Sequence, residues 1–343
     1  MKNIVILATG GTIAGAGELG KNIGYKSGSI KAQTLIDAIP ELKNVANICV
    51  EQFCNINSDD ITSEIWIVLA KRIQELLLRK DVDGIEVMHG TDTMEETALF
   101  LSLVLNAAET AAKPVILTGS MRPATASEPD GPANLLFAVK TAVSCPNVIL
   151  EPKAIGSSAV YVAFAGKLMN ARSVQKIHAN DLDAFAELSC PPHELSCPPE
   201  PALSEVEGSG HLPLVKSFDI SNLRELPRVS VLYFNADADA ELVRFAAERS
   251  AGLVIAGAGA GEFSRAWASA IADAVAEKNI PVVISTRINR GRIVPEQLLV
   301  PGTIAAYDLP PAKAAVLLRL ALTITNDSAT IQEMFESSCT LSS

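Results

Sequence analysis

The sequence predicts a two-domain α/β protein, with a larger N-terminal domain and a smaller C-terminal domain that each contain a parallel sheet. Short apolar runs typical of buried strands alternate with longer segments whose apolar residues recur at helical spacing. Such alternation, with short loops, is typical of parallel sheets covered by helices. The chain of 343 residues is long enough for two domains. The alternation breaks once, so we expect domains over 1–186 and 228–343, joined by a linker over 187–227.

In the N-terminal domain, each expected strand is an apolar run that ends in a glycine or a polar turn. Each expected helix has apolar residues at helical spacing. In chain order, the expected elements are the strand NIVILAT (3–9), the helix SEIWIVLAKRIQELLLRK (63–80), the strand and turn VDGIEVMHGTDT (82–93), the helix MEETALFLSLVLNAAET (94–110), the strand and turn KPVILTGS (113–120) and the helix GPANLLFAVKTAV (131–143).

The same alternation resumes after the linker and predicts the C-terminal domain. Its last helix has an uninterrupted apolar face, as expected for a helix that packs on a sheet. In chain order, the expected elements are the strand RVSVLYF (228–234), a helix over 239–250, the strand GLVIAGAG (252–259), the helix SRAWASAIADAVAEK (264–278), the strand PVVISTR (281–287) and the helix PPAKAAVLLRLALT (310–323).

The linker contains a segment of unusual composition, residues 187–210, in which proline is dense and apolar periodicity is lost. The hexapeptide ELSCPP occurs twice in it. Cys190, Cys197 and His193 could suggest a metal site, but a duplicated segment explains the same residues. We therefore expect a flexible insertion without a function of its own.

Composition excludes several classes of protein. A net charge of −11 argues against nucleic acid or an anionic membrane as the main partner. The six cysteines have no CxxC spacing and only four histidines are present, so we expect no metal site and no disulfide framework. The apolar run that ends at Gly10 is too short for a signal peptide, and no apolar stretch reaches transmembrane length. We therefore expect a soluble, cytoplasmic protein.

Two glycine-rich turns resemble the dinucleotide fingerprint but lie in the wrong context. GAGELG, from Gly15 to Gly20, satisfies G-x-G-x-x-G, but the preceding strand ends near Thr9 and a Gly- and Ser-rich loop follows. The fingerprint needs its first glycine at a strand end and its last at a helix start. The second turn, GAGAGE, has Glu262 in place of the third glycine. We therefore expect no nicotinamide or flavin site.

Polar residues follow three of the expected strands directly. Thr12 comes after the glycine pair of the first strand, Thr91 and Asp92 end the second, and Ser120 ends the third. In an open α/β sheet, reactive groups gather at the carboxyl ends of the strands. These residues are therefore candidates for a catalytic or substrate-binding site.

A structural alternative explains part of this pattern equally well. Asp92 or Thr93 could be the N-cap of the following helix, with Glu96 as its capping-box partner. Spacing alone favours this capping interpretation over catalysis.

Five sequence blocks favour catalysis over capping, namely ILATGGTIAG, HGTDTMEETA, GSMRP, DGPANLLFAV and AKAAVLLRLALT. They closely resemble the bacterial asparaginase/glutaminase family of amidohydrolases. The blocks occur in the family's order from the first strand to the last helix, and the resemblance covers nearly the whole chain outside residues 187–210.

The resemblance implies a role for each matching residue. Thr12 matches the nucleophile, Tyr25 the tyrosine of the lid, and Ser58 the residue that binds the substrate α-carboxylate. Ser120 is expected to contact the substrate as well. The second triad of the family matches Thr91, Asp92 and Lys176, where the segment RSVQKIHANDLDAF supports the position of the lysine.

The family's reaction is acyl transfer on a side-chain amide, without a metal or organic cofactor. A threonine hydroxyl needs a base to become a nucleophile, and a lysine can serve as that base when it is neutral. Backbone N–H groups near Thr12 and Thr91 would form the oxyanion hole. Which threonine attacks first is open, and we favour Thr12. The resemblance also implies a homotetramer, a dimer of dimers whose active sites lie between subunits.

The substrate's α-ammonium requires anions, since a buried unpaired charge is costly. Family members use the counterparts of Asp92 and Asp59 and a glutamate of the partner subunit. Glu296 is a candidate for that glutamate, and Glu262 stands where relatives carry Asn or Ser. We expect L-asparagine as the better substrate, with room for L-glutamine because Asp59 is short.

Two other functions stay open from the sequence. One is a catalytically idle relative that binds an amino acid as a sensor, against which the intact site residues argue. The other is the amidotransferase subunit that acts on misacylated tRNA. That role would need a basic surface and an added N-terminal domain, whereas this chain is acidic and begins at its first strand.

Overall fold

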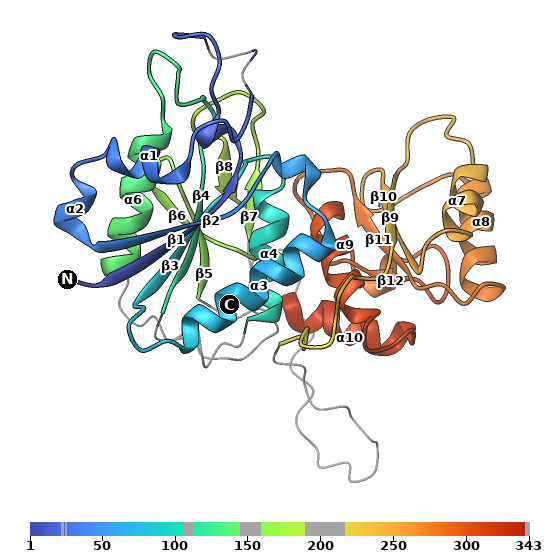
Figure 1. The fold of residues 1–343 in the computed structure, drawn as a ribbon. Helices are drawn as coiled ribbons and strands as arrows, with labels where there is room; N and C mark the ends of the chain where they lie inside the picture. Colours follow the sequence, from blue (N-terminus) through green and yellow to red (C-terminus); the bar gives the residue numbers. More distant parts are fainter. Residues whose placement is uncertain (22–23, 25, 106–112, 145–158, 189–216, 340–343) are drawn as a thin grey trace. The chain divides into compact units, whose positions relative to one another are not determined.

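A computed structural model of the protein describes residues 1–21, 24, 26–105, 113–144, 159–188 and 217–339 (Figure 1). The described residues form two compact units. The N-terminal unit holds those up to Leu188 together with Ser217–Leu226, and the C-terminal unit holds those from Pro227 onward. The two-domain α/β prediction is confirmed, while its limits at 186 and 228 remain our proposal.

The N-terminal unit contains most of the regular elements. They are β1 (Asn3–Gly10), η1 (Thr12–Ala14), α1 (Ala32–Asp37), α2 (Leu42–Val45), β2 (Asn47–Ile56), η2 (Ser58–Asp60), α3 (Ser63–Leu78), β3 (Gly84–Met88), α4 (Met94–Val104), β4 (Val115–Thr118), α6 (Gly131–Ser144), β5 (Val160–Phe164), β6 (Lys167–Asn170), β7 (Val174–Lys176) and β8 (Phe185–Glu187).

The sheet of this unit has six strands in the order β2-β1-β3-β4-β5-β6. The first five are parallel, and every residue of the central strands β3 and β4 is buried. The sixth strand, β6, pairs with β5 in the antiparallel direction, so the sheet is mainly parallel, as predicted. The reason for this direction is the tight β5–β6 turn, in which Ala165 and Gly166 both have positive φ, as in a type I′ hairpin. A separate antiparallel pair joins β7 and β8.

Helices cover both faces of the N-terminal sheet (Figure 1). On one face, α1, α2 and α6 enclose an apolar cluster that includes Ile4, Ile6 and Met88 from the strands and Ala138 and Val139 from α6. On the other face lie α3 and α4, which contact each other. The predicted helices 63–80 and 131–143 are confirmed as α3 and α6. The predicted helix 94–110 is confirmed as far as Val104, and residues 106–112 lie outside the described part.

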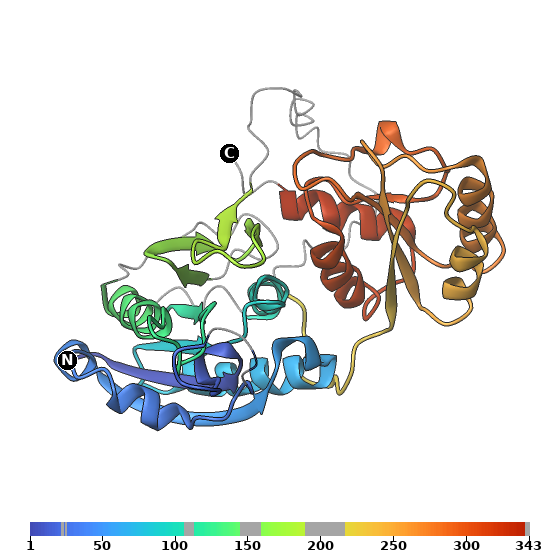
Figure 2. The same cartoon turned by 90° about the horizontal axis from the view of Figure 1, so that it is seen from above.

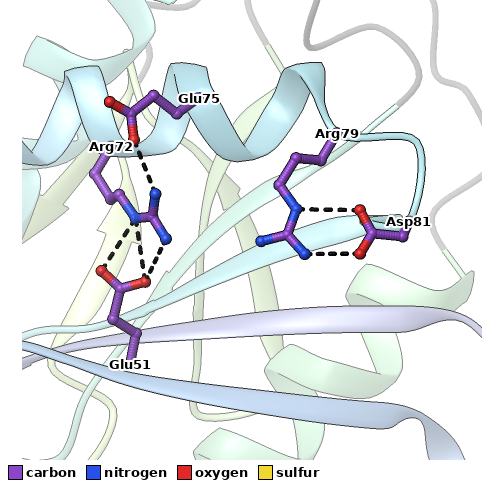
Figure 3. A network of polar contacts seen from close by, with 5 residues as sticks. All are labelled: Glu51, Arg72, Glu75, Arg79 and Asp81. Carbon is purple, nitrogen blue, oxygen red and sulfur yellow. Dashed lines mark hydrogen bonds and ion pairs between the residues drawn. The ribbon is translucent and has the colours of Figure 1, made fainter.

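An ion pair joins α3 to the edge strand β2, and two further ion pairs lie nearby (Figure 3). Arg72 on α3 donates from Nη2 to Glu51 Oε2 at 2.8 Å and from Nη1 to Glu75 Oε2 at 2.8 Å. These two carboxylates raise the pKa of Arg72. After the helix, Arg79 pairs with Asp81 at 2.7 Å. The side chains of each pair are about one-third exposed or more, so we expect each pair to contribute little to stability, and of these pairs only Arg72–Glu51 joins α3 to β2.

The C-terminal unit contains β9 (Val229–Tyr233), α7 (Glu241–Ala247), β10 (Gly252–Gly257), α8 (Arg265–Ala276), β11 (Val282–Thr286), η3 (Pro295–Gln297), β12 (Ile304–Ala305), α9 (Pro311–Ala321) and α10 (Ser328–Cys339). Its four strands are all parallel, in the order β12-β11-β10-β9. In Figure 2, α7 and α8 (gold) lie on one side of this sheet and α9 and α10 (red) on the other. The buried Trp267 of α8 belongs to the apolar core that also includes residues of α7, β10 and β11. The strands and helices predicted for this domain are confirmed, and α10 was not predicted.

Candidate active site

The predicted hydroxyl residues lie in turns at the carboxyl ends of four neighbouring strands, and we call this side of the sheet its carboxyl edge. Because the strand order is β2-β1-β3-β4, the turns that carry Ser58, Thr12, Thr91 and Ser120 follow one another along that edge. The chain leaves β1 toward β2 on one side and leaves β3 toward β4 on the other side. The carboxyl ends of β1 and β3 therefore form a topological switch point. Ligands of open α/β sheets bind at such points.

Glycines let three of these turns touch. A Cβ on Gly11, which has φ +78°, would lie 2.6 Å from Gly90 Cα. A Cβ on Gly90 would lie 2.7 Å from Ser58 Oγ. Glycine, which lacks a side chain, fits at such close contacts without displacing its neighbours. The turns of Thr12, Thr91 and Ser58 are therefore packed directly against one another.

Lys176 lies at the same edge, although it comes from β7. Its Nζ donates hydrogen bonds to Thr91 Oγ1 at 2.9 Å and to Asp92 Oδ1 at 2.6 Å. The lysine side chain is 15% exposed, whereas the Asp92 side chain is 68% exposed. The lysine is thus shielded beside a threonine hydroxyl, while the aspartate can still reach a ligand from solvent.

The capping interpretation of this turn is correct for the position of Thr93 and wrong for its side chain. Thr93 is the N-cap of α4, but its side chain makes no capping hydrogen bond. Its hydroxyl donates instead to the carbonyl of Ser58 at 2.7 Å. The Asp92 carboxylate bonds Lys176 rather than the helix N-terminus. Contacts with other turns therefore determine how these side chains are placed.

A buried histidine, which sequence reasoning missed, supports the β3–α4 turn. His89 Nδ1 lies 2.7 Å from the Gly90 carbonyl, and its Nε2 lies 3.0 Å from Thr97 Oγ1. Because the Thr97 oxygen accepts from Trp66 Nε1 at 2.8 Å, its proton is free to bond Nε2. This pattern assigns the proton of a neutral imidazole to Nδ1. Burial lowers the pKa of His89 to about 4, against the smaller opposite effect of its bond to Gly90.

The other predicted substrate-binding residues lie in different surroundings. Ser120 is buried, and its hydroxyl donates to the Arg122 carbonyl at 2.7 Å. Asp59 lies in η2 beside Ser58 and is exposed. Tyr25 lies outside the described residues. In the C-terminal unit, Glu262 and Glu296 are both exposed.

The glycine-rich segment after Thr12 forms a loop. Ala16 pairs with Lys26 in an antiparallel bridge, and the Gly28 N–H donates to the Gly11 carbonyl. The next helix, α1, begins only at Ala32. GAGELG therefore differs from the dinucleotide fingerprint, whose last glycine stands at the start of a helix.

Other features of the described residues concern metals, thiols and membranes. In the described part, no three His, Cys, Asp or Glu residues are grouped to hold a metal ion. The cysteines described there, Cys49, Cys54 and Cys339, are free thiols, and burial raises the pKa of Cys54 to about 11. Within the same ranges, no helix is both long and apolar enough for a membrane span.

Comparison with known proteins identifies the family. Residues 3–196 match the family described as "Asparaginase, N-terminal", and residues 228–335 match "Glutaminase/Asparaginase C-terminal domain". The chain belongs to the asparaginase family. The family resemblance predicted from the sequence motifs is thereby confirmed.

Individual relatives of this asparaginase-family chain match along nearly its whole length. It is 39% identical to L-asparaginase 2 of Bacillus subtilis, over 98% of this chain and 86% of the relative. It is 36% identical to a glutaminase-asparaginase of Pseudomonas fluorescens, over 98% and 90%. The solved structure of a probable cytoplasmic L-asparaginase from Campylobacter jejuni matches with a TM-score of 0.81 and 35% identity, over 98% of this chain and 100% of that one.

Proposed function

We propose that the protein is an L-asparaginase, which hydrolyses the side-chain amide of L-asparagine to L-aspartate and ammonia, with glutaminase side activity. The relatives named L-asparaginase and glutaminase-asparaginase support this function. The observation that carries it is the contact of Lys176 with Thr91 and Asp92, beside the turn of Thr12. This contact joins an amine, a carboxylate and a threonine hydroxyl, and a second threonine follows the neighbouring strand, at the carboxyl ends of the strands, where an α/β sheet binds its ligand.

In the proposed reaction, Thr12 Oγ1 attacks the amide carbon and loses its proton to a base. The C–N bond then breaks, and the nitrogen leaves as ammonia after it gains a proton. Water attacks the resulting ester, whose bond to Thr12 breaks, and the threonine hydroxyl is restored. Backbone N–H groups of the Thr12 and Thr91 turns would stabilise the oxyanion, where one donor typically contributes about 3 kcal/mol.

Lys176 supplies the base of the second triad in this proposal. An amine has a lone pair only after it has lost its proton. In that state, Nζ would accept the proton of the Thr91 hydroxyl across the contact of 2.9 Å. Thr91 would relay the proton or hold the water, and Asp92 would orient the amine.

The charges and positions of the site residues suggest which part of the substrate each of them binds. Ser58 would bind the α-carboxylate, and the exposed carboxylates of Asp92 and Asp59 would bind the α-ammonium. Ser120 would line the same edge, and Tyr25 would close the lid. No metal or organic cofactor is assigned a role in this reaction.

We extend the proposal to assembly and location. We propose a homotetramer, with Glu262 and Glu296 as candidates for the glutamate that the C-terminal domain of a partner contributes; light scattering would test the assembly. We also propose a cytoplasmic location, which the similarity to the probable cytoplasmic L-asparaginase of Campylobacter jejuni supports. A Haemophilus influenzae relative is named probable periplasmic, so cell fractionation is the direct test.

Ammonia release from L-asparagine and from L-glutamine tests the function. Thr12→Ala and Lys176→Met should each lower turnover by orders of magnitude while the protein stays folded. Lys140→Met is a matched control, because Lys140 is exposed on α6. A folded Thr12→Ala protein with near wild-type turnover would refute the mechanism. Asparagine binding without ammonia release would favour the sensor, and activity only with misacylated tRNA would favour the amidotransferase subunit.

A further inference from the structure

The first turn of α4 holds the backbone of Lys176. Glu95 Oε2 accepts a hydrogen bond from the backbone N–H of Lys176, across 81 positions of the sequence. Glu95 is half-buried, and α4 begins directly after the turn that carries Thr91 and Asp92. One short stretch of chain therefore bonds both ends of the lysine, the backbone through Glu95 and the amine through Thr91 and Asp92.

Lys176 lies in a short strand. This strand, β7, has three residues and, among the described residues, pairs with the three-residue β8 in a two-stranded sheet, in which Val174 and Phe185 are buried. A two-stranded pair is marginally stable by itself. The lysine stem is long and flexible, so the place of Nζ depends on where its Cα is held. The bond to Glu95 ties β7 to α4, the helix that follows Thr91 and Asp92.

We propose that Glu95 is a positioning residue for catalysis, which holds the Lys176 backbone so that the amine meets Thr91 and Asp92. The inference rests on the proposed function of Lys176. In this proposal Glu95 bonds the backbone of Lys176 and acts on the reaction through that residue. Its loss should therefore slow chemistry and leave substrate binding nearly unchanged.

Three variants test this assignment by kcat and KM for L-asparagine. Glu95→Ala should lower kcat by about 10- to 100-fold, with KM changed less than about 3-fold, because a misplacement near 1 Å can cost about 100-fold. Glu95→Gln keeps an oxygen that can accept the N–H, so it should stay within about 5-fold of wild type. Glu96→Ala, which removes a half-buried carboxylate from the same first turn, is the matched control and should change kcat much less.

A double-variant cycle separates positioning from a general structural effect. If Glu95 acts through Lys176, then adding Glu95→Ala to Lys176→Met should not lower the residual rate further. A thermal unfolding midpoint close to that of wild type must accompany the kinetic change. Equal effects of Glu95→Ala and Glu96→Ala, or a further loss in the double variant, would overturn the inference. If Lys176→Met itself keeps full turnover, the proposed role of the lysine fails instead.

Discussion

Replacement of Glu86 by methionine should stabilise the N-terminal unit, and increasingly so as the pH rises. Glu86 lies in the central strand β3, opposite Ile6 of β1 and Ile116 of β4. Both neighbours belong to the apolar cluster under α6. The side chain is fully buried, and neither carboxylate oxygen has a hydrogen-bond partner in the described part of the chain. Burial raises the pKa of Glu86 well above its ordinary value.

The gain in free energy of unfolding has a constant part and a part that depends on pH. A buried polar group without a hydrogen-bond partner costs about 1–3 kcal/mol, and an unbranched methionine can fill the same space without that cost. In the unfolded chain the carboxyl ionises near its ordinary pKa, whereas in the folded chain it stays protonated to higher pH. The unfolded state therefore binds fewer protons between the two pKa values. The stability of the wild type falls there by about 1.4 kcal/mol per pH unit, and the variant lacks this loss.

Urea unfolding at several pH values measures this difference. The chain has two tryptophans, Trp66 in the N-terminal unit and Trp267 in the C-terminal unit. In a Trp267→Phe background, fluorescence reports the N-terminal unit alone. Ile6→Met is the matched control, because it changes packing on the same face without a titratable group. A Glu86→Met protein that is less stable than wild type, or a stability gap that stays constant with pH, would refute the reasoning.

Three further predictions concern the turns of the site. The pKa of His89 is lower in the folded chain than in the unfolded chain, so neutral His89 contributes to the free energy of unfolding above pH 6.5, and this contribution is lost as the pH falls toward 4. His89→Asn should therefore remove a loss of roughly 3 kcal/mol in the free energy of unfolding over this pH range, measured by the same urea assay. Gly11→Ala should lower stability and turnover strongly, whereas Gly20→Ala, with a similar positive φ but no atom within 4 Å, should be far milder by thermal unfolding and ammonia release. Asp59→Asn should raise KM for L-asparagine markedly, and much less for an analogue without the α-amine; equal effects on both would exclude the proposed ammonium contact.

The two domains and most central elements follow from local pattern. The apolar runs of β1, β3, β4, β10 and β11 predict buried parallel strands, because such strands are covered on both faces. The edge strand β2 has no such run, since each of its residues is exposed or half-buried, and the sequence pattern does not predict it. Short strands such as β7 and β8 also lack a usable period. An apolar run predicts a strand that is buried along its length, whereas β2, β7 and β8 all contain exposed or half-buried residues.

The sequence by itself determined which residues follow the strand ends, and its motifs predicted the family. The tertiary structure decided which of these residues meet. Strand order placed the turns of Thr12 and Thr91 side by side, and the β7–β8 pair brought Lys176 to them across 85 positions of the sequence. The bond of Glu95 to the Lys176 backbone and the unpartnered carboxyl of Glu86 also became visible only in the fold. Hydrogen-bond partners depend on contacts between distant segments, and such contacts leave no period in the local sequence.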